Sequence, residues 1–381
     1  MTEVLFFIGL FGVSYSYFIY PLILVLITKT RKKCIYIVSH KTHPLPSISF
    51  IITAYNEENQ IAKKIENTLL VKYPSDKIEI IVASDGSSDK TNEIVDGYKN
   101  RGVTLHPVLE RKGKENAQKS AIEISIGDIL VFSDVSTQIE NTALLKIAKR
   151  FEDPMIGAIS SEDRFLTESG EVAGEGAYVK YEMWLRQLES RVNSLVGLSG
   201  SFFTARREVC NNWNINVPSD FNTALNCIHN ELIAVTDSKL LGFYPNLKDE
   251  TKEYQRKVRT VIRGMAALSS QAFIMNPFKH GFFAFQVISH KLMRWLVPWF
   301  LLLTLVTNFL LFKLSYFYKF SFTIQVLFYG MAITGYLSTS ARQTPLIKIC
   351  YFFIQVNLAI FHSSLMYISG KRVTLWEPSK R

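Results

Sequence analysis

Four long uncharged runs dominate the pattern of hydrophobic and polar positions along the chain. Each run has about 18–25 residues, which as a helix is enough to cross the roughly 30 Å hydrocarbon core of a bilayer. One such run could be a buried helix, but four together predict a multi-pass membrane protein. The runs are Val4–Thr28, Trp295–Phe312, Phe320–Ala341 and Ile349–Gly370.

Between the first and second runs, short apolar stretches alternate with segments of helical spacing. Ile48–Ile52, Lys77–Ala83 and Asp128–Ser133 have the character of buried strands, and Asn59–Leu70 and Lys90–Lys99 that of helices. Alternation of strands and helices predicts an α/β domain, in which helices cover both faces of a parallel sheet.

Polar residues follow each of the three predicted strands. They are Tyr55, Asn56 and Glu57 after the first strand, Asp85 and Asp89 after the second, and Asp134 after the third. Loops are polar in general, so one such ending says little. Because ligands bind beyond the carboxyl ends of parallel strands, three endings at one edge predict a site for a divalent metal and a sugar or base.

The charge of the chain bears on its orientation and partners. A basic stretch, Lys29–Lys33, follows the first run, and the positive-inside rule places it and the α/β domain in the cytoplasm. The formal net charge of +10 suits contact with anionic lipid head groups or with a nucleotide diphosphate. No aromatic-interleaved basic stripe or nucleic-acid motif occurs, so we expect no nucleic-acid partner.

The ends of the first run favour a membrane anchor over a cleaved signal peptide. Glu3 precedes the run, no lysine or arginine does, and the run is longer than a normal signal core. The four cysteines form no CxxC pair, which indicates neither a zinc site nor a disulfide framework and suits a reducing compartment.

These patterns divide the chain into six predicted regions. A basic amphipathic stretch lies before Trp295 and is typical of a helix in the membrane interface. The regions are an amino-terminal transmembrane helix (1–30), a basic linker (31–46), a cytoplasmic α/β domain (47–275), an interfacial helix (276–294), about three membrane segments (295–370) and a basic tail (371–381).

The side of the membrane on which the chain ends is a separate question. An odd number of carboxyl-terminal spans would put the basic tail outside, against the positive-inside rule. We therefore expect that one of the last runs is re-entrant or lies flat, and that the carboxyl terminus is cytoplasmic.

Six motifs occur in a fixed order along the chain. They are FIITAYNEE (50–58), VASDGSSDKT (82–91), RKGKENAQKSA (111–121), Asp134-Val-Ser136, Pro218-Ser-Asp-Phe221 and Arg256-Lys-Val-Arg259-Thr260. From about Ser47 to the end, the chain in this way resembles the membrane-embedded branch of the family 2 inverting glycosyltransferases. That branch includes cellulose, chitin and hyaluronan synthases and bacterial exopolysaccharide enzymes. The resemblance implies a GT-A-like, Rossmann-like α/β domain with a parallel or mixed sheet, flanked by transmembrane helices.

The resemblance also implies roles for the residues at the matching positions. Tyr55, Glu57 and Asp85 would contact the uracil and ribose of a UDP-sugar, with Lys114 near the nucleotide. Asp134 would bind the Mg²⁺ or Mn²⁺ that bridges the diphosphate, Asp220 would be the general base, and Arg256 and Arg259 would hold the leaving diphosphate.

Three motif positions differ from the family pattern. Ser136 replaces the second metal carboxylate, Ser219 replaces the glutamate beside the base, and Thr260 replaces a tryptophan near the acceptor sugar of processive synthases. Mg²⁺ often needs only one or two protein carboxylates when phosphates and water supply the rest, so Asp134 can serve alone.

Each of these residues also has a structural interpretation. Asp134 could be only a polar residue that starts a loop. Asp220 could be the N-cap of a helix that begins near Phe221. Arg256, Arg259 and Arg263 share a helix face that suits phosphate, but such a face could equally be a solvated basic surface.

The leading hypothesis is a membrane-bound inverting glycosyltransferase that transfers sugar from a UDP-sugar to a growing polysaccharide or glycolipid, as in exopolysaccharide or capsule biosynthesis. About four membrane helices make a narrow conduit for a monomer, which counts toward an enzyme that adds single sugars. An oligomer or partner export proteins are further candidate partners. One alternative is a transferase that adds a single sugar to a lipid carrier. Another is a catalytically inactive scaffold subunit of a polysaccharide synthase. A transporter is disfavoured because the uncharged runs contain no group to relay ions.

Overall fold

The computed structural model describes residues 1–30, 44–166, 177–245 and 250–372, which belong to two compact units. The sheet unit is built from residues 24–248 and 266–283, and the helical unit from residues 1–23, 249–265 and 284–372. Most of the predicted basic linker and basic tail lies outside the described residues.

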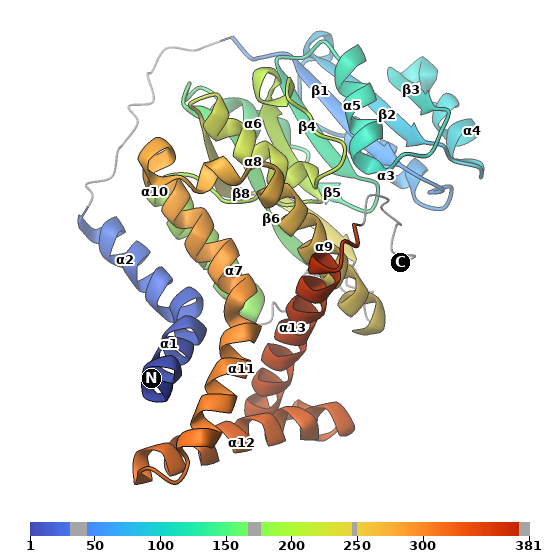
Figure 1. The fold of residues 1–381 in the computed structure, drawn as a ribbon. Helices are drawn as coiled ribbons and strands as arrows, with labels where there is room; N and C mark the ends of the chain where they lie inside the picture. The colour runs from blue at the N-terminus through green and yellow to red at the C-terminus, as the bar shows by residue number, and fades with distance from the viewer. Residues whose placement is uncertain (31–43, 167–176, 246–249, 373–381) are drawn as a thin grey trace. The chain divides into compact units, whose positions relative to one another are not determined.

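The sheet unit contains one eight-stranded mixed sheet with the order β3-β2-β1-β4-β7-β6-β8-β5 (Figure 1). Strands β3, β2, β1 and β4 run parallel, and β7 runs antiparallel to both β4 and β6. This confirms the predicted α/β domain with a mixed sheet. The strands are β1 (Ile48–Ala54), β2 (Ile78–Asp85), β3 (Val103–Val108), β4 (Ile129–Asp134), β5 (Gln138–Ile139), β6 (Ile156–Leu166), β7 (Phe202–Arg206) and β8 (Ile233–Pro245).

Helices cover both faces of this sheet. Helix α4 ends earlier than the predicted Lys90–Lys99, because Gly97 follows it and Lys99–Arg101 form a 3₁₀ turn. The helices of the unit's main segment are α3 (Ile61–Leu69), α4 (Thr91–Asp96), α5 (Lys114–Ile124), α6 (Ala143–Arg150), α7 (Ala177–Val192) and α8 (Ser219–His229).

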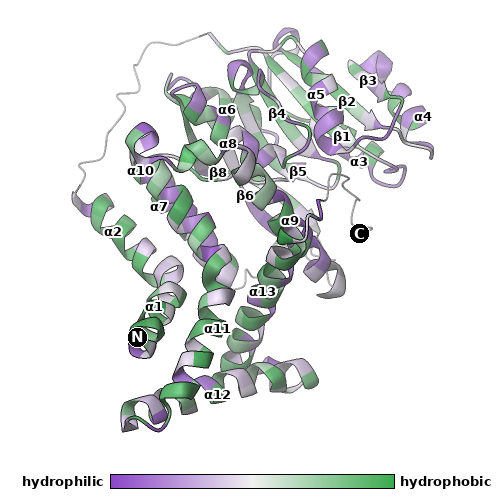
Figure 2. Ribbon diagram, in the orientation of Figure 1, coloured by the Kyte–Doolittle hydropathy of each residue, from purple (hydrophilic) through white to green (hydrophobic). Residues whose placement is uncertain are grey.

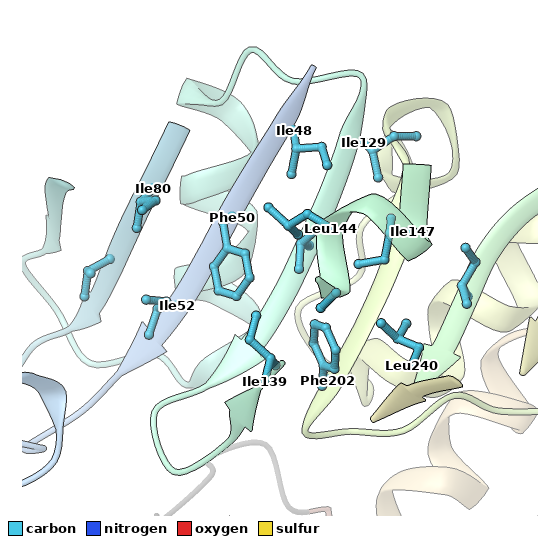
Figure 3. Packing of buried hydrophobic residues seen from close by; sticks show 14 of the residues in the cluster. Ile48, Phe50, Ile52, Ile80, Ile129, Ile139, Leu144, Ile147, Phe202 and Leu240 are labelled. Carbon is cyan, nitrogen blue, oxygen red and sulfur yellow. The ribbon is translucent and has the colours of Figure 1, made fainter. Parts of the chain in front are cut away.

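Alternate residues of β1 build two hydrophobic cores, one on each face of the sheet. Phe50 and Ile52 belong to the core that Leu144 of α6 also joins (Figure 3), and Ile51 belongs to the opposite core under α5 and α8. Every residue of β1 is buried, as expected for a central parallel strand with helices on both faces. The strand ends are therefore held on a rigid scaffold.

Within the described residues, four helical stretches are long and apolar enough to cross a membrane, and they overlap the four uncharged runs. They are Thr2–Thr30, Pro277–Leu311, Tyr316–Leu337 and Pro345–Ile368. Figure 2 shows apolar residues predominating along α1, α11, α12 and α13. The helices are α1 (Thr2–Ser14), α2 (Tyr20–Thr30), α9 (Glu250–Ser270), α10 (Pro277–Val287), α11 (Met293–Leu311), α12 (Tyr316–Leu337) and α13 (Pro345–Ile368).

The residues of the predicted interfacial helix (276–294) are continuous with the second span. They form α10, a π-helical turn at Ile288–Leu292 and the start of α11. The backbone departs from helical geometry at Gly281, where φ is 50° and ψ is −126°. A position in the membrane interface stays a prediction for the part near this break.

Two glycines let α1 pack closely against α11 in the helical unit. A Cβ atom placed on Gly12 would lie 2.3 Å from the Phe300 ring, and one on Gly9 would lie 2.4 Å from Thr304 Oγ1. Small residues at such contacts are typical of helix pairs in membranes, where close packing replaces the hydrophobic effect.

Candidate active site

The parallel strands bring the predicted acidic residues to one edge of the sheet. In register, Thr53 of β1 pairs with Asp134 of β4, and Ala54 pairs with Ser84 of β2. Asp85, Tyr55 and Asp134 therefore lie in this order across the edge, because each is at or just beyond the end of its strand. The sequence predicted this arrangement correctly.

Asp85 ties the end of β2 to the loop before α5. Its carboxylate is buried and accepts hydrogen bonds from the backbone N–H groups of Lys112 (3.0 Å) and Gly113 (2.9 Å). Gly113 has φ of 101°, which a residue with a side chain rarely adopts. Asp85 thus fixes the turn from which Lys114 begins α5.

At the same edge of the sheet, the ring of Tyr55 contacts the positively charged side chain of Arg111. The guanidinium of Arg111 lies 3.9 Å from the centre of the Tyr55 ring, within the range of a cation–π contact. Arg111 belongs to the basic motif that the sequence singled out, although the sequence assigned it no role. The pair places an aromatic face and a positive charge beside Asp85.

The loops after β1 and β2 are joined by backbone-to-side-chain hydrogen bonds. The N–H of Glu57 donates to Thr91 Oγ1 (2.8 Å), and that of Glu58 donates to Asp89 Oδ2 (3.1 Å). Partial burial raises the pKa of Asp89, but hydrogen bonds from Thr91 and the Glu58 amide outweigh this and hold the pKa below its ordinary value. The loop that carries Glu57 is thereby fixed by the neighbouring loop.

Asp134 forms an ion pair with Lys114. Lys114 Nζ lies 2.5 Å from Asp134 Oδ1 and donates a second hydrogen bond to the carbonyl of Gly200 (2.7 Å). The lysine side chain is 9% exposed and the aspartate side chain 23%. The structure therefore brings together two residues that the sequence predicted separately, and leaves part of the carboxylate open to a ligand.

Asp220 approaches the same loop from α8. A Cβ atom placed on Gly200 would lie 3.4 Å from Asp220 Oδ2, so this carboxylate lies beside residue 200, whose carbonyl accepts the hydrogen bond from Lys114. Helix α8 begins at Ser219 with Pro218 as its N-cap, so Asp220 occupies the first turn and is not the cap. The alternative of an N-cap at Asp220 is therefore wrong, although a carboxylate in the first turn also interacts favourably with the positive end of the helix dipole.

A serine cluster that the sequence did not predict supports the loop at Gly200. Ser199 and Ser201 both donate hydrogen bonds to Asp163 Oδ1, at 2.6 and 3.0 Å. Burial raises the pKa of Asp163 above its ordinary value, against these hydrogen bonds, which lower it. Ser201 in turn accepts the N–H of Asp134 on its carbonyl (2.9 Å). No sequence motif indicated Asp163, because Ser199 and Ser201 are distant from it in the chain.

A buried lysine, Lys64 of α3, lies on the other side of the Asp134 turn. Its ammonium group donates to Ser133 Oγ (2.7 Å) and to the carbonyl of Thr137 (2.6 Å). Burial lowers the pKa of Lys64 to about 7, although the charge of Asp134 acts to raise it. The helical spacing predicted an apolar face on this helix, so no pattern indicated a site residue at position 64.

The predicted diphosphate-binding arginines lie on α9, in the part that belongs to the helical unit. Arg256 is exposed and forms two hydrogen bonds with Glu253, at 2.9 and 2.8 Å, and Arg259 is half-buried. Their contact with a donor stays a prediction.

The residues at the strand ends fit a divalent cation held mainly by a substrate. Among the described residues, no group of three or more histidine, cysteine, aspartate or glutamate side chains could hold a metal. Asp134 supplies one carboxylate, which suffices for Mg²⁺ or Mn²⁺ when phosphate oxygens and water complete the shell. A hard cation at Asp134 would compete with Lys114 for the carboxylate.

The mixed sheet has a GT-A-like α/β fold. The mannosyltransferase PcManGT of Pyrobaculum calidifontis, solved in complex with GDP-Man and Mn²⁺, has the same fold, with a TM-score of 0.74 and 17% sequence identity. The similarity covers 98% of this chain and 100% of that one.

Sequence comparison finds a family similarity in the central region. Residues 49–213, which lie within the sheet unit, match the family described as Glycosyl transferase family 2. The match agrees with the resemblance to family 2, and the membrane-embedded branch of that family stays a prediction. The match includes Tyr55, Asp85, Lys114 and Asp134 and ends before Asp220.

Two relatives with assigned functions are similar over this region. A beta-monoglucosyldiacylglycerol synthase of Trichormus variabilis is 26% identical over 184 residues, which are 45% of this chain and 38% of the relative. A poly-beta-1,6-N-acetyl-D-glucosamine synthase of Staphylococcus aureus is 29% identical over 162 residues, 40% of this chain and 39% of the relative. The chain thus spans about two fifths of the length of these relatives.

Proposed function

We propose that this protein is a membrane-bound inverting glycosyltransferase that moves a sugar from a nucleotide diphosphate sugar, by preference a UDP-sugar, to a polysaccharide or glycolipid acceptor. The observation that carries the proposal is that Lys114, which pairs with Asp134, and Asp220 both lie at the backbone of Gly200. An acid, a cation and a second acid within one small region are the groups that glycosyl transfer needs.

Asp220 is the proposed general base. It takes the proton of the acceptor hydroxyl as that oxygen attacks the anomeric carbon of the donor sugar. The bond between this carbon and the diphosphate oxygen breaks on the opposite face, so the configuration inverts. Its place in the first turn of α8, away from the capping position, leaves the carboxylate available for this role.

Lys114 is proposed to stabilise the departing diphosphate. Its ammonium group exchanges Asp134 for a phosphate oxygen when the donor binds, and negative charge grows on that oxygen as the sugar leaves. Mg²⁺ or Mn²⁺, held by Asp134 and the diphosphate, would add positive charge at the same place. Tyr55, Glu57 and Asp85 are proposed for the nucleoside, and Arg256 and Arg259 for the diphosphate, as the resemblance implies.

The acceptor and the setting are proposed from the relatives and the membrane helices. One similar protein is named for a glycolipid and the other for a polysaccharide, so both acceptor classes stay open. The spans predict an integral protein of the cell membrane with the sheet unit in the cytoplasm. Transfer of a single sugar to a lipid carrier is the second candidate, favoured by Thr260 at the position of the processive tryptophan.

The first test is nucleotide release by the purified full-length protein in detergent. The donor panel contains UDP-sugars and GDP-mannose, each with Mg²⁺, with Mn²⁺ and with EDTA, in the absence and presence of lipid acceptors. We expect release from one donor, lost in EDTA. We expect Asp220→Asn to lower turnover at least about 100-fold, the usual contribution of a positioned base.

The controls separate a lost base from a lost fold. Asp134→Ala should lower both the turnover and the stimulation of nucleotide release by the metal. Asp76→Asn, at an exposed aspartate, should leave both quantities unchanged. Full activity in Asp220→Asn would contradict the proposed base. Nucleotide binding without release across the whole panel would favour the inactive-scaffold alternative.

A further inference from the structure

Lys64 is buried where the amphipathic pattern of α3 calls for an apolar residue. Its side chain is 1% exposed and lies between Ile61 and Ile65, which both belong to the core under the sheet. A charged side chain in such a place costs free energy unless its contacts compensate. A methionine or leucine would fill the volume without that cost, so packing alone does not account for the lysine.

The contacts of Lys64 flank the metal motif on the side of the sheet that carries α3. Its ammonium group binds Ser133 Oγ on one side of Asp134 and the carbonyl of Thr137 on the other side of Ser136. Within the turn, the N–H of Thr137 donates to the carbonyl of Asp134 (3.1 Å). One buried group therefore fixes both ends of the four-residue turn that presents Asp134.

Two groups other than Lys64 also hold this turn. Lys114 pairs with the Asp134 carboxylate, and the Asp134 N–H donates to the carbonyl of Ser201. Among the described residues, only Lys114 contacts the carboxylate, so a bound cation or phosphate would perturb this contact. The contacts of Lys64 lie on Ser133 and Thr137, and they would persist when the carboxylate changes partner.

We propose that Lys64 is a positioning residue of the donor site, which fixes the Asp134–Thr137 turn so that the single carboxylate of the motif keeps its orientation while Lys114 and a divalent cation exchange on it. The proposal rests on the proposed function for its metal and its donor. It explains why a motif with Ser136 in place of an acid tolerates the loss: the remaining carboxylate is held from both sides. Lys64 itself touches neither donor nor metal.

The experiment compares Lys64→Met with Lys63→Met in the full-length protein in detergent. Lys63 is the exposed neighbour on the same helix, so the pair differs only in burial and contacts. The first readout is hydrogen exchange of the peptide that covers residues 133–139, with the β1 peptide 48–54 as internal reference. We expect at least tenfold faster exchange of 133–139 in Lys64→Met, and no change of either peptide in Lys63→Met.

The second readout is Mn²⁺ affinity by electron paramagnetic resonance in the presence of UDP. We expect at least tenfold weaker binding in Lys64→Met and an unchanged affinity in Lys63→Met. Unchanged exchange of 133–139 in Lys64→Met, or an unchanged Mn²⁺ affinity, would overturn the proposal. If the wild-type protein bound no Mn²⁺ but the exchange effect occurred, the metal in the proposed function would fail while the role of Lys64 in holding the turn would stand.

A milder variant guards against misfolding of Lys64→Met. Ser133→Ala removes one of the two contacts and leaves the lysine in place, so we expect an intermediate rise in exchange and an intermediate loss of Mn²⁺ affinity. Wild-type values in this variant for both readouts would also count against the proposal.

Discussion

Buried charge at Lys64 has a consequence for stability that is separate from its role in the site. Burial lowers its pKa from 10.5 to about 7 in the folded protein. Between these two values the unfolded chain binds more protons than the folded one, so raising the pH through this window stabilises the fold. Below about pH 7 the folded protein bears the full cost of the charged form.

We therefore expect the thermal midpoint of the wild type to rise relative to that of Lys64→Met as the pH is raised from 7 to 9. Two pH units correspond to about 2–3 kcal/mol, at ~1.4 kcal/mol per unit of pKa shift. Thermal unfolding of both proteins in the same detergent at several pH values measures this, with Lys63→Met as the control. A difference that does not change with pH would show that Lys64 titrates normally.

Single side chains were predictable from the sequence only where a motif named them. Asp85, Asp134 and Asp220 stand at the positions that the motifs indicated, and Lys114 and Asp134 prove to be in contact. Asp163 and Lys64 were missed for a physical reason. Their partners lie about 36–38 and 69–73 residues away along the chain, and no local pattern shows that a polar group will be buried opposite them.

Among the strands, the direction of β7 decides how the site is assembled. Because β7 runs antiparallel to β4, its amino end lies at the edge where β4 ends, and the preceding loop Ser199–Ser201 meets Asp134. The sequence predicted the parallel strands β1, β2 and β4 from their apolar runs. It did not predict β7, because periodicity does not reveal the direction in which a strand pairs.

Among the helices, the contact of α1 with α11 depends on the absence of a side chain at Gly12. We expect Gly12→Val to lower the thermal stability of the full-length protein in detergent by several degrees, because the added carbons would overlap the Phe300 ring. Size-exclusion chromatography after heating at a series of temperatures measures the effect. Gly330→Val in α12 is the matched control, since no heavy atom lies within 4 Å of its Cβ position.

If Gly12→Val had the thermal stability of the wild type, or if Gly12→Val and Gly330→Val lost the same amount, close packing at Gly12 would not be what holds the two helices together.

For the chain as a whole, the number of spans and the charges at its carboxyl end predict opposite sides of the membrane for the carboxyl terminus. Four helices can span a membrane, and an even number places the two termini on the same side. The positive-inside rule puts Lys29–Lys33 in the cytoplasm, which would leave the basic tail outside. A cytoplasmic tail then requires that one of the last helices does not cross.

We expect a cysteine introduced as Lys380→Cys, in a background without the four native cysteines, to be protected from a membrane-impermeant thiol reagent in intact cells and to react after the membrane is opened. The parent without cysteine is the control for background labelling. Reaction from outside intact cells would place the tail outside and establish four complete crossings.

The close contact of α1 with α11 also sets an order of events during synthesis. About 280 residues separate the two helices. At roughly 5–20 residues per second, the ribosome needs on the order of 15–55 seconds to synthesise these intervening residues. For that time α1 remains in the bilayer without its partner, and lipid chains cover the surface at Gly9 and Gly12. The first helix is therefore an early anchor that gains its permanent neighbour only after the sheet unit has left the ribosome.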